Sequence, residues 1–281
     1  MKIGILTDST ANLKEFQYER SFVKVIDFTV VIDGIAHSAN GLSSETFYTK
    51  MAQATSLPST SQGSVMHVVS LLEEFKQEGY TDVIVLTISS KLSGSYKNIA
   101  MAAKEVDGLH VHLPDSKTTE VMLGATVIDV ASMIEANASL DVILTSLNTM
   151  LNGDGALFYV DSLKHLVKGG RISGASGMVG EALKIKPILG LTAAGTIELQ
   201  EKKRTKSKAL DRLVELYKEA VQDQPHTLYF LYSDNPDEVR AFSETIVTPR
   251  ATRVFKPITP VVGAHTGPGV IGLGWRMEQR A

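Results

Sequence analysis

The sequence predicts a protein of the α/β class with two α/β domains. Short apolar runs alternate with amphipathic segments of helical period through the first half, and this pattern changes in the second half. Regular alternation of this kind is typical of an open, mostly parallel sheet. The second half contains two strand-like runs joined by a short turn, so we expect antiparallel strands there.

The apolar runs of the first half predict buried strands, because they are short and mostly rich in branched residues. The first amphipathic segment starts at a capping residue, Ser64, and stops at Gly79, as helices often do. The predicted strands are residues 2–6, 83–88, 109–113 and 156–160. The predicted helices are residues 64–79, 94–106 and 119–136.

The second half is expected to open with an antiparallel hairpin over residues 186–202, where a turn containing glycine joins two strand-like runs. Turn residues gather at 151–155, so we predict an N-terminal domain over residues 1–153 and a C-terminal domain over residues 154–281. The remaining predicted elements are helices at 205–222 and 236–247 and strands at 226–233, 252–256 and 258–263.

The composition is that of an ordinary globular chain of 281 residues with enough apolar material for a sizeable core. Its formal net charge of -3 argues against a nucleic-acid or membrane-surface partner, since such partners usually require a basic excess. The absence of cysteine excludes disulfides and thiolate metal sites. No apolar stretch approaches the roughly 18 residues of a membrane span, and no signal peptide is visible. We therefore expect a cytoplasmic protein without a membrane span.

Polar residues gather where three predicted strands of the first half end. In open α/β sheets, ligands bind where strands lead into loops, often at helix N-termini. A single cluster of this kind is more often a set of helix caps, because Ser, Thr and Asp accept hydrogen bonds from free backbone N–H groups. Their recurrence at one kind of position indicates a binding site. The clusters are TDST (7–10), TISSKLSGS (87–95) and PDSKTT (114–119).

Three further segments add polar groups to this set. Arg171 offers a planar fork suited to a carboxylate or phosphate, although a helix end followed by a surface arginine fits equally well. His265 and Thr266 lie between glycines after the predicted strand 258–263. Hydroxyls, backbone N–H groups, an arginine and a histidine are suited to an anionic group rather than to a metal or a dinucleotide. The segments are SLPSTSQGS (56–64), KGGRISGASG (168–177) and GAHTGPGVIGLG (263–274).

Two enzymatic alternatives stay open, although the chain lacks G-x-x-x-x-G-K-[ST], H-E-x-x-H and G-x-S-x-G. The first is a serine acyltransferase or hydrolase that uses Ser93 with His265, oriented by Asp8 or Asp115. The second is a small-molecule kinase or phosphate-binding domain that uses the glycine-containing loops.

The order and spacing of these short motifs resemble those of the DegV family of fatty-acid-binding proteins, over residues 3–274. The resemblance implies two α/β domains that hold one long-chain fatty acid, such as palmitate, stearate or oleate, in a tunnel between or beneath them, without a cofactor. It also implies that a separate fatty acid kinase subunit phosphorylates the carboxylate, in a route to phospholipid metabolism. The motifs are ILTDST (5–10), STSQ (59–62), TISSKLSGSY (87–96), PDSKTTEVMLG (114–124), LVKGGRIS (166–173), LKIKPIL (183–189) and HTGPG (265–269).

The resemblance also implies which residues contact the fatty-acid carboxylate. Two departures from the family pattern are Ser95, where threonine is usual, and Gly63, where proline is usual and whose replacement should loosen the loop. We expect Ser93 both to cap a helix and to bind the carboxylate. The methionines Met122, Met133 and Met178 are candidates for the tunnel lining, although methionine is more often core filler. The implied carboxylate contacts are Thr60, Ser61, Ser93, Gly94, Arg171, His265 and Thr266, with Asp8 and Ser9 as possible additions.

Overall fold

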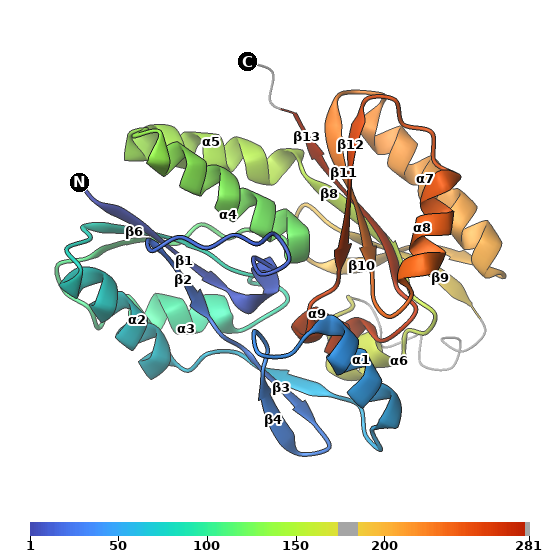
Figure 1. Ribbon diagram of the computed structural model, residues 1–281, viewed down its shortest axis with the longest axis horizontal. Helices are drawn as coiled ribbons and strands as arrows, with labels where there is room; N and C mark the ends of the chain where they lie inside the picture. The colour runs from blue at the N-terminus through green and yellow to red at the C-terminus, as the bar shows by residue number, and fades with distance from the viewer. Residues whose placement is uncertain (174–184, 279–281) are drawn as a thin grey trace.

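The computed structural model describes residues 1–173 and 185–278 and contains three β-sheets with helices around them. Figure 1 shows two large sheets side by side, with helices packed around and between them and a small sheet below them. The predicted α/β class is confirmed, as is the contrast between a parallel sheet in the first half and antiparallel strands in the second.

The sheet of the first half has four parallel strands in the order β2-β1-β6-β7. Successive side chains of β1 and β6 point to opposite faces of the sheet. Every position in both strands is buried, so both faces are covered by helices. α4 (Glu120–Glu135) and α5 (Leu140–Gly153) pack on one face, whereas α2 (Val65–Gln77) and α3 (Ser95–Ala102) pack on the other. The strands are β1 (Ile3–Asp8), β2 (Val23–Ile26), β6 (Asp82–Leu86) and β7 (His110–His112).

The sheet of the second half has six strands in the order β10-β9-β8-β13-β11-β12, and only the pair β11–β12 is parallel. The amphipathic helices α7 (Lys206–Val221) and α8 (Pro236–Glu244) cover its outer face (Figure 1). The strands are β8 (Gly155–Tyr159), β9 (Lys186–Leu191), β10 (Ile197–Lys203), β11 (His226–Tyr232), β12 (Ala251–Pro257) and β13 (Ile271–Met277).

A small antiparallel sheet in the order β4-β3-β5 lies below the two large ones, next to three short helices (Figure 1). Strand β5 (Ser59–Ser61) pairs with β3 (Thr29–Ile32), which also pairs with β4 (Ile35–Ser38). These elements bring together polar segments from both ends of the chain. The helices are α1 (Ser44–Gln53), α6 (Lys164–Gly169) and α9 (Pro260–Thr266).

The strand predicted at 258–263 is wrong, because α9 begins at Pro260. The Thr259 hydroxyl caps this helix by accepting a hydrogen bond from Val262 N at 3.4 Å, and proline fits the first helical position. The apolar run Pro-Val-Val therefore belongs to a buried helix, which could not be told from a strand by periodicity in so short a run. His265 and Thr266 consequently lie in the last helical turn rather than after a strand.

The other predicted strands and helices are present with small shifts of their ends, and Ser64 caps α2 as expected. The strands β2 and β13, the small sheet and the helices α1, α5 and α6 were not predicted from the sequence. The change from the first large sheet to the second falls at residues 153–155. The division into domains at this point stays a prediction.

One apolar core continues from the parallel sheet through the small sheet to the inner face of the six-stranded sheet. Gly274 of β13 permits the close approach of α4, since an added Cβ would lie 3.0 Å from the sulfur of Met122. The core is incomplete where the three sheets meet, and cavities remain there. In the described ranges, no helix is long and apolar enough to cross a membrane.

Candidate functional site

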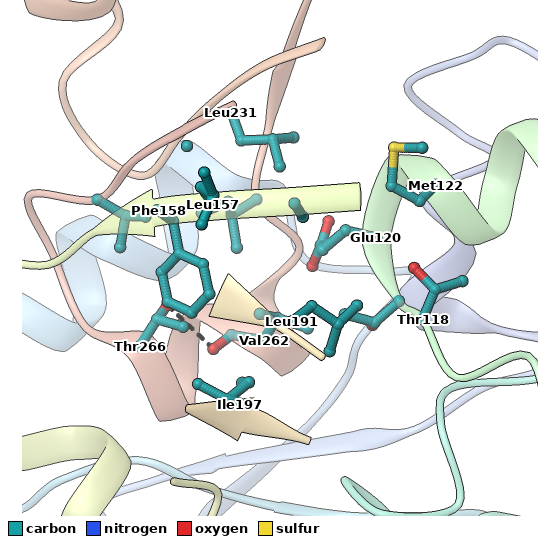
Figure 2. Close-up of a pocket in the computed structure, with 15 residues that line it drawn as sticks. Thr118, Glu120, Met122, Leu157, Phe158, Leu191, Ile197, Leu231, Val262 and Thr266 are labelled. Carbon is teal, nitrogen blue, oxygen red and sulfur yellow. Dashed lines mark hydrogen bonds between the residues drawn. The ribbon is translucent and has the colours of Figure 1, made fainter. Parts of the chain in front are cut away.

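Two cavities adjoin where the three sheets meet, and the empty space in them and at their open sides is about 590 and about 510 Å³. They share four lining residues, so they lie next to each other. The larger one, here the apolar cavity, is lined mainly by aliphatic and aromatic side chains such as Leu157, Phe158 and Leu231 (Figure 2). The smaller one, here the polar cavity, has several polar side chains in its lining. The shared lining residues are Thr119, Ile197, Val262 and Thr266.

The polar cavity collects side chains from segments that are far apart in the sequence. The small sheet contributes Thr60, the loop before α3 contributes Ser93, and the loop after α6 contributes Arg171. The last turn of α9 contributes His265 and Thr266. These five residues were all predicted from the sequence to share one site, and the fold brings them together at one cavity. Gln62 also lines this cavity, and the sequence interpretation had not singled it out.

The Thr60 hydroxyl and the His265 ring form a direct contact, with 2.7 Å between Oγ1 and Nε2. Burial, together with the positive charge of Arg171 and the nearby His165, lowers the pKa of His265 to about 4. The ring is therefore uncharged near neutral pH. It forms a hydrogen bond with Thr60 and adds no positive charge to the cavity. A bound anion would meet two polar groups already held in position.

The Ser93 hydroxyl accepts a hydrogen bond from Ser95 N at 3.1 Å, at the start of α3. This contact resembles the expected cap, although Gly94 occupies the N-cap position itself. Since the oxygen is the acceptor in this contact, the Ser93 O–H proton remains available to a ligand in the cavity. Glycine at 94 leaves room for Gln62, because an added Cβ would lie 2.6 Å from Gln62 Nε2.

Arg171 follows α6 through Gly170, whose φ of 69° favours glycine. Its Nε donates to the Leu92 carbonyl at 3.3 Å, and Nη1 donates to the Gly169 carbonyl. Within the described part of the chain, no ion pair joins Arg171 to an acidic side chain. The cavity therefore carries a half-buried positive charge held by neutral carbonyl groups, which is the electrostatic condition for binding an anion.

Four predicted residues, Ser61, Gly94, Asp8 and Ser9, lie outside the lining of both cavities. Ser61 follows Thr60 in β5 and points to the opposite face, with an exposed side chain. Asp8 accepts hydrogen bonds from Thr10 and from Ile88 N, the latter at 2.8 Å. Ser9 Oγ accepts from Phe28 N at 3.1 Å. Asp8 and Ser9 therefore fix the backbone of Ile88 and Phe28, which do line the polar cavity.

Gly63 does not loosen its loop as expected. An added Cβ at this position would lie 2.5 Å from Ile26 Cγ2, so glycine permits close packing. Its carbonyl accepts a hydrogen bond from Asn98 Nδ2 at 2.9 Å, which ties the loop to α3.

The candidate methionines have different surroundings. Met122 lines the apolar cavity, whereas Met133 is partly buried and packs against the core of the parallel sheet. Met178 lies outside the described residues, as do 174–177 of the arginine-containing segment and 183–184 of LKIKPIL.

The geometry does not assemble a serine–histidine–aspartate triad. His265 Nε2 contacts Thr60, and no hydrogen bond connects His265 with Ser93 in the described residues. Asp8 is bonded to Thr10 and Ile88, and Asp115 accepts the Ser90 hydroxyl at 2.5 Å. A general base for Ser93 is therefore not in place.

The loop 267–272 has the spacing G-x-G-x-x-G, which the sequence interpretation overlooked. This loop leads from α9 into β13, whereas the dinucleotide-binding motif follows a strand and opens a helix. It therefore offers no helix N-terminus for a pyrophosphate. Among the residues that the structure describes, there is also no group of His, Asp and Glu that could hold a metal ion.

Comparison with known proteins gives one consistent family. The family model described as "Uncharacterised protein, DegV family" matches residues 2–278. The DegV domain-containing protein spr1415 of Streptococcus pneumoniae is 34% identical over 278 residues, which cover 98% of this chain and 99% of the relative.

Solved structures agree with this match. The fatty acid binding DegV family protein SAG1342 of Streptococcus agalactiae has a TM-score of 0.90 and 30% identity, and the similarity covers 99% of this chain and 100% of that one. DegV, a fatty acid binding protein from Bacillus subtilis, has a TM-score of 0.87 and 30% identity, with the same coverage. The chain therefore belongs to the DegV family.

Proposed function

We propose that this chain binds one long-chain fatty acid, such as palmitate, stearate or oleate, in the two adjoining cavities. The observation that carries the proposal is the junction of an apolar cavity with a polar one in which Arg171 has no acidic partner among the described residues. A fatty acid has the same division, since a single anionic group is attached to a long apolar chain. Two solved relatives described as fatty acid binding proteins support the same ligand class.

The energetics of this ligand match the two environments. A carboxylate that leaves water must receive hydrogen bonds, or it takes up a proton instead. Ser93 and Arg171 can donate such bonds directly, and the Thr60–His265 pair can donate a further one. Each methylene buried in the apolar cavity contributes about 0.8 kcal/mol, so the acyl chain supplies most of the affinity.

The proposed carboxylate contacts are the side chains that line the polar cavity. Ser61 and Gly94 would contribute through their backbone, because the Ser61 side chain is exposed and glycine has none. Asp8 and Ser9 would act indirectly by holding Ile88 and Phe28. The ligand is the fatty acid itself, and the proposal needs no cofactor. The side-chain contacts are Thr60, Ser93, Arg171, His265 and Thr266.

We also propose that the chain presents the carboxylate to a separate fatty acid kinase subunit, which forms an acyl phosphate. The exposed Ser61 directly follows Thr60, so the carboxylate end of the site lies close to the protein surface. Hydroxylamine trapping of the acyl phosphate, with loaded chain, kinase subunit and ATP all present, tests this role. The expected cytoplasmic location stays a prediction.

The variant Arg171→Gln tests the binding proposal because it removes the charge and keeps a polar side chain. A hydrogen bond to a charged group contributes roughly 1.5–3 kcal/mol, so oleate affinity should fall by about 10- to 100-fold. The matched control is Arg204→Gln, which removes an exposed arginine outside the lining of both cavities. Equal oleate affinity for both variants in a fluorescent fatty-acid displacement assay would contradict the assignment of Arg171.

A further inference from the structure

A carboxyl group, that of Glu120, lines the apolar cavity at the start of α4. Its side chain is buried, and Figure 2 shows it projecting from the helix toward the space that Leu157 and Val262 also line. The φ of Glu120 is 57°, a conformation that a residue with a side chain seldom adopts. Such strained backbone tends to occur at binding sites, because surrounding contacts must hold it.

One side of the Glu120 carboxyl group is occupied by Thr259, the residue that caps α9. Oε1 accepts from the Thr259 hydroxyl at 2.5 Å and from Thr259 N at 3.1 Å, whereas Oε2 is 3.3 Å from the same N. Burial raises the pKa of Glu120 to about 8, so the group carries a proton near neutral pH. Oε1 accepts the two shorter hydrogen bonds, so the proton belongs on Oε2. Among the described residues, no atom accepts a hydrogen bond from this Oε2–H group.

The neighbouring Thr119 adds a second unpaired polar group. Its hydroxyl oxygen is buried and has no hydrogen-bond partner in the described part of the protein. Thr119 lines both cavities, so this residue lies where the polar and apolar cavities meet. A buried donor or acceptor usually has a partner. The Glu120 O–H, which has no acceptor in the described ranges, and the adjacent Thr119 oxygen, which has no donor there, therefore indicate that a ligand supplies the missing partners.

We propose that Glu120 and Thr119 form a second polar subsite, which binds a hydroxyl group on the acyl chain. The preferred ligand is then a hydroxylated long-chain fatty acid. This inference depends on the proposed fatty-acid binding, because the acyl chain delivers the hydroxyl to the apolar cavity.

A hydroxyl group fits this pair better than other substituents. It accepts a hydrogen bond from the protonated Oε2 of Glu120 and donates one to the Thr119 oxygen, so both unpaired groups gain a partner. An unsubstituted chain leaves both groups unpaired. A second carboxylate would bring a charge into the apolar cavity, whereas Arg171 lies in the polar one.

The test is a competition experiment with the delipidated full chain. Stearic acid competes against hydroxystearic acids that carry the hydroxyl near the head, at the middle or near the tail of the chain. The wild type is expected to prefer at least one hydroxylated isomer by about tenfold, since two neutral hydrogen bonds are gained. Glu120→Leu should reverse this preference, because it makes the subsite apolar.

Two further variants complete the design. Thr119→Val keeps the shape of the side chain and removes the hydroxyl, so it should reduce the preference and provides the test if Glu120→Leu does not fold. Glu135→Gln, at the exposed end of the same helix, is the control that should leave the preference as in the wild type.

The outcomes separate the two proposals. Binding of stearic acid without preference for any hydroxylated isomer overturns the subsite and leaves fatty-acid binding intact. A preference that survives in both Glu120→Leu and Thr119→Val also overturns it. Failure of the wild type to bind any of these acids overturns fatty-acid binding itself, and the subsite with it.

Discussion

The buried Glu120 makes the stability of this protein depend on pH in a predictable direction. Its pKa is raised by burial from 4.5 to about 8, and the bonds from Thr259 only partly oppose this rise. Between these two values the folded protein holds a proton that the unfolded chain has released. Unfolding therefore releases a proton, and the free energy of unfolding falls as pH rises through this range.

The magnitude follows from the size of the pKa shift. Each unit corresponds to about 1.4 kcal/mol, so the full shift of Glu120 corresponds to about 5 kcal/mol above pH 8. Glu120→Gln removes the titrating group and keeps a carbonyl oxygen that can accept from Thr259. The unfolding free energy of the variant relative to that of the wild type should thus increase by about 4 kcal/mol as pH rises from about 5 to about 9.

Urea unfolding of both delipidated proteins at several pH values measures this difference. Burial also raises the pKa of Asp8 to about 6, but Asp8 is present in both proteins and its contribution largely cancels. The change in the difference between the two unfolding free energies is therefore clearest above about pH 6.5, where Asp8 is mostly ionised. Glu105→Gln, at an exposed position, controls for the loss of a carboxyl group. A difference between wild type and Glu120→Gln that stays constant across the range would refute the reasoning.

Two further predictions concern the polar cavity. Ser93→Ala should weaken oleate binding by about threefold to tenfold, since it removes one neutral hydrogen-bond donor, and unchanged affinity in a displacement assay would remove Ser93 from the site. Gly94→Ala places a Cβ 2.6 Å from Gln62 Nε2, so it should displace Gln62 and lower oleate affinity while Gly108→Ala, at an open surface turn, leaves affinity unaffected. If the two glycine variants bind oleate with equal affinity, the space at residue 94 is not needed for oleate binding.

Several large elements of the fold were predicted from the sequence because their signals are local. The cap at Ser64, the hairpin at 186–202 and the charged helix at 205–222 each depend on residues close together in the chain. The segment 258–263 failed because an apolar run of this length is compatible with a strand or a buried helix. β13 was missed because glycine at 272 and 274 obscures its strand pattern, although those glycines give room to neighbouring side chains.

The prediction of the site was limited in the same way, because local sequence patterns do not show long-range contacts. Motifs suggested that Thr60 and His265 act together, but their contact spans 205 positions and depends on β5 and α9 lying side by side. From the sequence, Glu120 looked like an ordinary residue at the start of a helix. Its role could not be seen, because its carboxyl group is held by Thr259, which lies 139 positions away. Thr119 belongs to the predicted cluster 114–119, but a threonine before a helix normally signals a cap, and here its hydroxyl makes no capping bond. Long-range packing decides such roles, and a local pattern does not contain it.

The central claim is that the two cavities hold a fatty acid, and mass spectrometry of the purified chain tests it most directly. The protein is measured under native conditions and again after organic extraction. The account predicts one long-chain fatty acid per chain, lost on extraction and regained when oleate is added. A chain that is purified without a bound lipid and takes up no added fatty acid would contradict it.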